Sequence, residues 1–183
     1  MNDPAVSNRW QRWRGSLLGL SLFALLLGAI ALQLWWDQSQ AVSVGSKAPH
    51  FRLETFHHGS IDTETLRGKV ILVNFWGSWC TACHLEAEDL QRLWQRYRDE
   101  DVSFIGVAYL DTLHDASAYL KKYGIDYPTG LDTIQQITRQ FQINGAPETF
   151  LIDRSGIIRY FQAGPIDTRA LTRAIERAIA ESA

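Results

Sequence analysis

The sequence predicts a mixed α/β domain over residues 49–183, preceded by one apolar segment near the N-terminus. Two continuous apolar runs rich in β-branched residues, Val70–Trp76 and Val102–Ala108, are typical of strands buried on both faces of a sheet. A segment with helical spacing of apolar residues follows each run, and this alternation requires parallel strands joined by crossover helices. A late pair of strands around a tight turn is expected to add an antiparallel edge.

The first half of the domain begins with a short hairpin, because apolar residues flank the turn-forming sequence His57-His58-Gly59. After the first apolar strand, apolar residues at helical spacing predict a helix from Cys83 to about Arg98. After the second strand, a further helix is predicted over Leu113–Tyr123. Gly124 is expected to end this helix as its C-cap.

The second half is predicted to contain two helices and one hairpin. A short helix is expected to open at Asp132, with Gln135 in the capping-box position. Thr149–Asp153 and Ile157–Phe161 are expected to pair as a hairpin, and the last helix is expected to start near Asp167. The residues expected on its buried face are Leu171, Ile175, Ala178 and Ile179.

The uncharged, apolar run of residues 15–36 is long enough to cross a membrane. A helix of this length spans about 33 Å at 1.5 Å per residue, and the hydrocarbon core of a bilayer is about 30 Å thick. Three arginines in residues 1–14 precede the run, and no Lys or Arg follows it before Lys47. This asymmetry predicts a single-pass anchor with residues 1–14 in the cytoplasm and the domain outside it.

The alternative is a cleaved signal peptide, because Ser39-Gln40-Ala41 is an acceptable small-x-small cleavage site. The apolar run is longer than the roughly 7–15 residues of a signal-peptide core, which favours the uncleaved anchor. Either outcome places the chain from about residue 40 onward outside the cytoplasm. The small and polar residues 37–48 are expected to form the linker.

Composition and charge exclude several classes of protein. A hydrophobic fraction of 46% and a charged fraction of 21% are ordinary globular usage, which excludes disordered, collagen-like and multi-span membrane chains. A net charge of −2 argues against a nucleic-acid partner bound through phosphate neutralisation. With only 2 cysteines, the chain is not a disulfide-stapled scaffold.

Both cysteines lie in one C-x-x-C motif, Cys80 and Cys83, between a buried strand and the start of a helix. In this context the motif indicates redox chemistry, and the spacing allows a disulfide. Cys80 lies at the helix N-terminus, where unpaired amides and the helix dipole stabilise a thiolate. Cys83, one turn further, is expected to be more buried. The sequence therefore predicts Cys80 as the nucleophile and Cys83 as the resolving cysteine.

Three other interpretations of the motif are weaker. A structural disulfide across so short a loop removes little chain entropy, and zinc needs ligands that no second cysteine pair supplies. His84 completes a C-x-x-C-H string, which is also the attachment signature of c-type haem. Attached haem would consume both sulfurs, and the only methionine, Met1, is on the wrong side of the membrane. His84 is instead expected at the surface of the first helical turn, near Cys80.

Two segments resemble a known family. Residues 73–86, VNFWGSWCTACHLE, resemble the active-site strand and helix of thioredoxin-like proteins. Residues 145–160, GAPETFLIDRSGIIRY, resemble the cytochrome c maturation thiol:disulfide interchange proteins of the DsbE/CcmG group, and extracytoplasmic reductases of the ResA/TlpA type share much of this pattern. The resemblance covers about residues 45–180. It implies a thioredoxin-like fold with an N-terminal hairpin extension and a central insertion.

The resemblance also implies roles for three residues. Pro147 matches the family's cis-proline, which faces the cysteine pair and whose exposed backbone lets a substrate chain pair beside the disulfide. Glu86 lies one helical turn beyond Cys83, where a carboxylate can accept the resolving thiol's proton. Glu148 matches an acidic rim around the site. An exposed first-turn glutamate and an ordinary charge at a hairpin edge are the alternatives for Glu86 and Glu148.

Two further positions bear on the redox chemistry. Asn74 stands where cytosolic thioredoxins carry a buried Asp, and Asn is common there in the exported group. Thr81-Ala82 lacks the proline common between such cysteines. Because these two positions help to set the redox potential, the direction of the reaction stays open at this point.

Together these features imply a periplasm-facing thiol:disulfide oxidoreductase of the inner membrane, whose redox group is a Cys80–Cys83 disulfide without any cofactor. The family's role is reduction in cytochrome c maturation, with apocytochrome c or a haem-lyase component as substrate. A membrane protein of the DsbD/CcdA type would supply electrons. A general periplasmic reductase or isomerase, and a haem- or metal-binding module, are the alternatives.

Overall fold

The computed structural model describes residues 23–33 and 42–181, and the chain divides into two units, Met1–Ala41 and Val42–Ala183. In the first unit, residues 23–33 are helical. The expected cytoplasmic segment, both ends of the expected anchor at 15–36 and the first part of the linker lie outside the described residues. Within the described ranges, no helix combines the length and the apolar character needed to cross a membrane.

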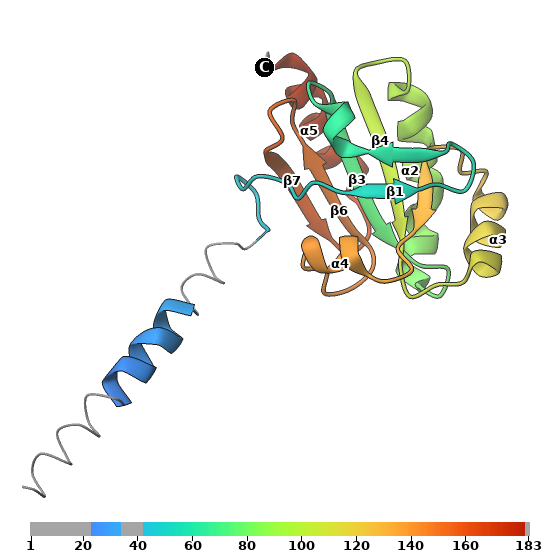
Figure 1. Cartoon of the computed structure of the whole chain (residues 1–183). Helices are drawn as coiled ribbons and strands as arrows, with labels where there is room; N and C mark the ends of the chain where they lie inside the picture. Colours follow the sequence, from blue (N-terminus) through green and yellow to red (C-terminus); the bar gives the residue numbers. More distant parts are fainter. Residues whose placement is uncertain (1–22, 34–41, 182–183) are drawn as a thin grey trace, which may run out of the picture. The chain divides into compact units, whose positions relative to one another are not determined.

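The second unit is built on a five-stranded sheet in the order β5-β4-β3-β6-β7 (Figure 1). β3 runs parallel to β4 and β4 parallel to β5, whereas β6 is antiparallel to both β3 and β7. This arrangement confirms the predicted parallel core with an antiparallel edge. The strands are β3 (Val70–Trp76), β4 (Val102–Ala108), β5 (Thr129–Leu131), β6 (Glu148–Ile152) and β7 (Ile158–Ala163).

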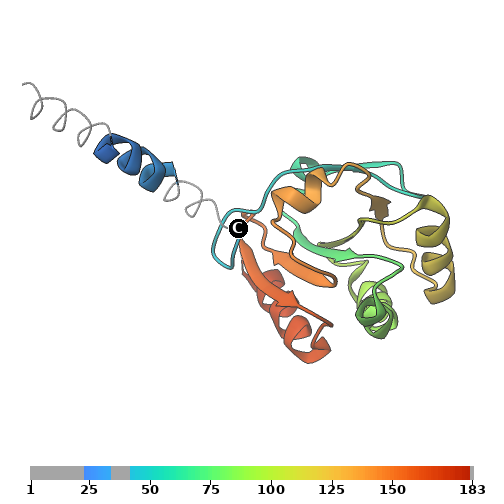
Figure 2. The ribbon, with the colours of Figure 1, turned by 90° about the horizontal axis from the view of Figure 1, so that it is seen from below.

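Three helices cover one face of this sheet: α2 (Thr81–Tyr97), α3 (Leu113–Tyr123) and α5 (Thr168–Ala180). Their buried side chains share one hydrophobic cluster with the sheet, and this cluster contains both cysteines. A parallel strand pair joined through a helix almost always crosses over in a right-handed sense, so α2 and α3 are placed on the same face. Figure 2 shows α2 and α5 together on this side.

The opposite face is covered by α4 (Gln136–Gln140) and by the hairpin of β1 (Arg52–Glu54) and β2 (Ser60–Asp62). Their apolar residues form a second cluster against the sheet, which includes Phe51, Leu53, Ile137 and Phe141. The predicted leading hairpin is thereby confirmed. β3 is buried at every position, because helices and hairpin together cover both of its faces.

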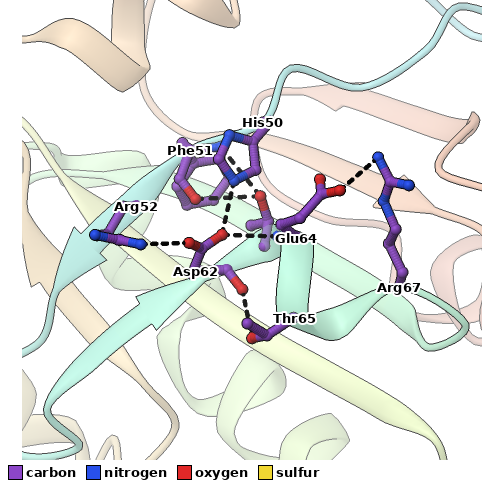
Figure 3. Close-up of polar contacts among 8 residues, drawn as sticks. His50, Phe51, Arg52, Asp62, Glu64, Thr65 and Arg67 are labelled. Atoms are coloured by element: carbon purple, nitrogen blue, oxygen red, sulfur yellow. Dashed lines mark hydrogen bonds and ion pairs between the residues drawn. The ribbon is translucent and has the colours of Figure 1, made fainter.

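One carboxylate holds the hairpin together (Figure 3). Asp62 accepts hydrogen bonds from Nε2 of His50 over 2.7 Å, from Nη2 of Arg52 over 2.7 Å and from the backbone N–H of Glu64 over 2.9 Å. These bonds, the one from His50 first, hold the pKa of Asp62 well below its usual range. Asp62 thus ties the chain entering β1 to the start of the 3-10 turn η1 (Thr63–Leu66).

Two local predictions for the segment between β4 and β6 are wrong. α4 starts at Gln136 rather than at Asp132, and Gln135 gives no side-chain cap because it lies in the left-handed region with φ +53°. Asp132 instead accepts hydrogen bonds from the backbone N–H groups of Gln136 and Thr138, and so caps the helix from outside. The short edge strand β5 was not predicted. It needs Gly130, because a Cβ there would lie 2.1 Å from the carbonyl oxygen of Glu54.

The predictions for the ends of α3 and α5 agree more closely with the structure. α5 starts next to Asp167 as predicted. Asp167 is its N-cap, and its carboxylate accepts hydrogen bonds from the N–H groups of residues 169 and 170. Gly124 ends α3 in the left-handed conformation, also as predicted. Leu171, Ile175 and Ala178 are buried, whereas Ile179 is only half-buried.

Candidate active site

The two cysteines form a disulfide at the N-terminus of α2, with their Cα atoms 5.3 Å apart. The helix begins at Thr81, two residues before the predicted start, because Cys80 itself is the N-cap. Its sulfur accepts a hydrogen bond from the backbone N–H of Cys83 over 3.0 Å. Cys80 is 4% exposed and Cys83 is 0% exposed, which confirms the expected order of burial. This order favours Cys80 as the sulfur that a partner reaches.

The loop before Cys80 is fixed by the segment that follows β4. The backbone N–H and the hydroxyl of Ser78 donate hydrogen bonds to the two carboxylate oxygens of Asp111, over 2.6 and 2.8 Å. The indole N–H of Trp79 donates to the carbonyl oxygen of Tyr109 over 3.3 Å. A Cβ at Gly77 would lie 2.4 Å from this indole nitrogen, so the loop packs closely around Trp79.

Glu86 lies on α2, one helical turn beyond Cys83, and is only 2% exposed. Oε1 accepts a hydrogen bond from Nδ2 of Asn74 over 2.9 Å, and Oε2 accepts one from the backbone N–H of Ile166 over 2.8 Å. Burial raises the pKa of Glu86 to about 7, although both hydrogen bonds oppose this shift. Glu86 is therefore not an exposed first-turn glutamate. It is a buried carboxyl group able to take up or release a proton near neutral pH.

The peptide bond between Ala146 and Pro147 is cis, as the resemblance implied. The carbonyl oxygen of Pro147, however, accepts a hydrogen bond from Gly164 over 2.8 Å and is not free for a substrate. Among the described residues, the backbone N–H and C=O of Ala146 have no hydrogen-bond partner. The backbone groups available for strand-like pairing therefore belong to Ala146, which packs against both hydrophobic clusters.

Glu148 lies under this loop and not on a solvent-exposed rim, since its side chain is only 5% exposed. Oε1 accepts hydrogen bonds from the backbone N–H groups of Asn144 and Gly145, both over 3.1 Å. Burial raises the pKa of Glu148, and these two hydrogen bonds oppose the shift. The contacts give Glu148 a structural task, which is to hold the loop that carries Ala146 and Pro147.

His84 is not the free surface residue that the sequence suggested. It is half-buried, with Nε2 2.9 Å from the carbonyl oxygen of Ser78 and Nδ1 2.8 Å from the hydroxyl of Tyr123.

Sequence reasoning also missed Tyr119, whose hydroxyl donates to the carbonyl oxygen of Cys83 over 2.8 Å. Asp111 was missed too, although its place just after a parallel strand, at the carboxyl edge of the sheet, was a usable signal. In the described part of the chain, no group of three or more His, Cys, Asp or Glu side chains is placed to hold a metal ion.

Comparison with known proteins identifies this arrangement. Residues 44–161 match the AhpC/TSA family. The chain belongs to the AhpC/TSA family. It is 34% identical over 170 residues to the thiol:disulfide interchange protein DsbE of Allochromatium vinosum, covering 90% of this chain and 92% of the relative. It is 27% identical over 143 residues to the thiol-disulfide oxidoreductase ResA of Bacillus thuringiensis, covering 76% of this chain and 83% of that protein.

The same relationship holds in three dimensions. The crystal structure of a thiol:disulfide interchange protein of the thioredoxin family from Chlorobium tepidum matches with a TM-score of 0.68 at 28% identity. The match covers 76% of this chain and 99% of that chain. This AhpC/TSA-family protein is thus a thiol:disulfide oxidoreductase of the DsbE/ResA type with a thioredoxin-like fold, and Cys80 and Cys83 form its disulfide.

Proposed function

We propose that this oxidoreductase is a reductant in cytochrome c maturation, anchored in the inner membrane with its domain on the periplasmic side. The observation that supports this role most is the 34% identity to a DsbE protein over 90% of the chain. The apolar run 15–36, with arginines on one side only, supports the anchor and its orientation. The proposed substrate is the disulfide in the C-x-x-C-H segment of apocytochrome c, or a disulfide of a haem-lyase component.

The reaction is a two-electron thiol–disulfide exchange. The thiolate of Cys80 attacks one sulfur of the substrate disulfide, so that a mixed disulfide forms and one substrate thiolate leaves. Cys83 loses its proton and attacks the sulfur of Cys80, which releases the second substrate thiolate and forms the Cys80–Cys83 disulfide. The substrate gains two electrons and the enzyme is oxidised. A membrane protein of the DsbD/CcdA type then reduces the enzyme by the same exchange in reverse.

The residues around the pair suit this sequence of steps. The N–H of Cys83 already points at the sulfur of Cys80, and it stabilises a thiolate there in the reduced enzyme. Glu86, one helical turn beyond Cys83 and with a pKa of about 7, takes the proton of the resolving thiol. The free backbone groups of Ala146 pair with the substrate chain beside its disulfide, as an added strand would.

The second candidate is a general periplasmic reductase or isomerase, and the similarity to ResA proteins favours it. Its chemistry at Cys80 and Cys83 is the same, and the two candidates differ only in which proteins dock. The haem-binding alternative has less support, because the two sulfurs are bonded to each other and both ring nitrogens of His84 have partners within the protein.

Trapping of the mixed disulfide separates these candidates. The Cys83→Ala variant of the full chain keeps the attacking sulfur but cannot release the substrate, so a covalent complex accumulates through Cys80. The proposed role predicts few trapped species, chiefly apocytochrome c or a haem-lyase component. The double variant with Ala at both cysteines is the control and accumulates none. Recovery of many unrelated exported proteins would reject the maturation role in favour of the general reductase.

A further inference from the structure

All polar groups of Ser78, two residues before the attacking cysteine, are engaged by other parts of the domain. Its N–H and hydroxyl bind Asp111, in the loop between β4 and α3. Its carbonyl oxygen lies 2.9 Å from Nε2 of His84, on the first turn of α2. The loop that leads into Cys80 is therefore held from two sides, and His84 provides one of them.

The chemistry of its partners determines which ring nitrogen of the neutral His84 imidazole carries the hydrogen. A carbonyl oxygen can only accept, so Nε2 carries a hydrogen and donates it to Ser78. In the neutral ring Nδ1 then has a free lone pair, and it accepts from the hydroxyl of Tyr123 over 2.8 Å. The ring is also packed against the aromatic rings of Tyr119 and Tyr123, with centroids 5.0 and 5.6 Å away. His84 is thus fixed in position as well as in tautomer.

Helix α3 contacts both ends of the active-site turn through these groups. At one end, the hydroxyl of Tyr119 donates directly to the carbonyl oxygen of Cys83 over 2.8 Å. At the other end, Tyr123 reaches Ser78 through His84. Tyr119 is itself held by stacking on the buried ring of Trp76, with centroids 4.3 Å apart. Between these two attachments lies Cys80, whose sulfur faces the N–H of Cys83 at 3.0 Å.

We propose that His84 is a positioning residue for Cys80, which ties the carbonyl of Ser78 to the hydroxyl of Tyr123 and so keeps the sulfur of Cys80 directed at the N–H of Cys83. In the reduced enzyme this N–H stabilises the thiolate. Without His84, the loop before Cys80 keeps its attachments to Asp111 and Tyr109 but loses the one to helix α3, and the sulfur is less firmly held against the amide. In this role the histidine of the C-x-x-C-H string acts without haem.

Three variants of the full chain test this role. His84→Ala removes both hydrogen bonds of the imidazole. If the thiolate of Cys80 thereby loses the stabilisation of about one hydrogen bond, its acid dissociation constant falls roughly fivefold. We expect the acid dissociation constant of Cys80, read from the pH profile of its alkylation, to fall about fivefold, and the equilibrium with glutathione, measured at a pH above the pKa of Cys80, to move about fivefold toward the disulfide. His84→Gln restores both quantities, because its amide can donate to Ser78 and accept from Tyr123. Tyr123→Phe gives an intermediate effect, since one attachment is lost.

The matched control is His114→Ala, since His114 is on α3, its side chain is 89% exposed, and among the described residues its one polar contact is with Asp115. It should leave the alkylation profile and the glutathione equilibrium unchanged. A merely structural role for His84 would lower the melting temperature of His84→Ala and leave both redox quantities at their wild-type values, and that result overturns the proposal. It is equally overturned if His84→Gln behaves like His84→Ala.

Discussion

Asn74 on β3 donates a hydrogen bond to Glu86 on α2 over 2.9 Å, inside the layer between the sheet and the active-site helix. The same amide group donates to the hydroxyl of Thr149 on β6 over 3.0 Å. Asn74 therefore joins the central strand, the strand that follows the cis-proline and the helix that carries the cysteines. The carboxyl group it contacts, one helical turn beyond Cys83, accepts only from neutral donors among the described residues, and no ion pair with a cation stabilises its charge there.

This arrangement predicts a pH-dependent stability. The pKa of Glu86 is raised by burial from 4.5 to about 7, so its favourable contribution is present below about pH 4.5 and is lost as the pH rises through about 7. Relative to Glu86→Gln, the oxidised protein should lose about 3 kcal/mol of unfolding free energy over that range. Urea unfolding of both proteins between pH 4 and 8 measures it. Parallel stability profiles would contradict the buried, protonatable state of Glu86.

Glu148 gives a prediction with a matched pair of variants. Because one oxygen, Oε1, accepts from both Asn144 and Gly145, the amide oxygen of Glu148→Gln can replace it. Glu148→Ala leaves two backbone N–H groups without an acceptor and should lose about 2–4 kcal/mol of unfolding free energy. Glu148→Gln should stay within about 1 kcal/mol of the wild type. If denaturant unfolding finds both variants equally unstable, the negative charge of Glu148 stabilises the protein and its two hydrogen bonds to the loop do not.

The proposed anchor predicts the location and topology of the chain. A reporter fused after Ala183 should be active only if it is a type that works outside the cytoplasm, because the arginines before residue 15 keep the N-terminus inside. Washing of membranes at high pH should not release the protein. Recovery of a mature form that begins at Val42 would show cleavage and reject the anchor.

The burial of the two sulfurs predicts which cysteine reacts. In the reduced protein, Cys80 lies at the helix N-terminus and receives the N–H of Cys83, so its thiolate should titrate below the free value of about 8.5. A limiting amount of iodoacetamide at neutral pH should therefore label mainly Cys80, as peptide mapping would detect. Dominant labelling of Cys83 would reverse the roles assigned to the pair.

Much of the fold was predictable because burial leaves a strong local pattern. β3 and β4 are apolar at all but one position each, and α3 and α5 carry apolar faces with a recognisable cap, Gly124 or Asp167. β5 has three residues, one of them Gly130, which is too few for any periodicity to appear. The start of α4 was misplaced because its cap comes from Asp132, four residues before the helix.

The site was predictable where its chemistry lies within one short motif, and not where the partners are distant in sequence. Cys80 and Cys83 are three residues apart, and local spacing places them on one helical turn. The partners of His84 and Glu86 include Tyr123 and Ile166, which only the folded topology brings to α2. The structural task of Glu148 also depends on a loop conformation that the sequence does not reveal.

The reduction potential of the Cys80–Cys83 pair decides whether the pair serves as a reductant. The measurement is a redox titration of the full chain in detergent against glutathione and dithiothreitol, with the reduced fraction read by thiol alkylation. A reductant should have a potential well below that of the oxidant DsbA, about −120 mV, and closer to that of thioredoxin, about −270 mV. A potential near about −120 mV would mean that the pair oxidises its partners, and it would contradict the proposed role.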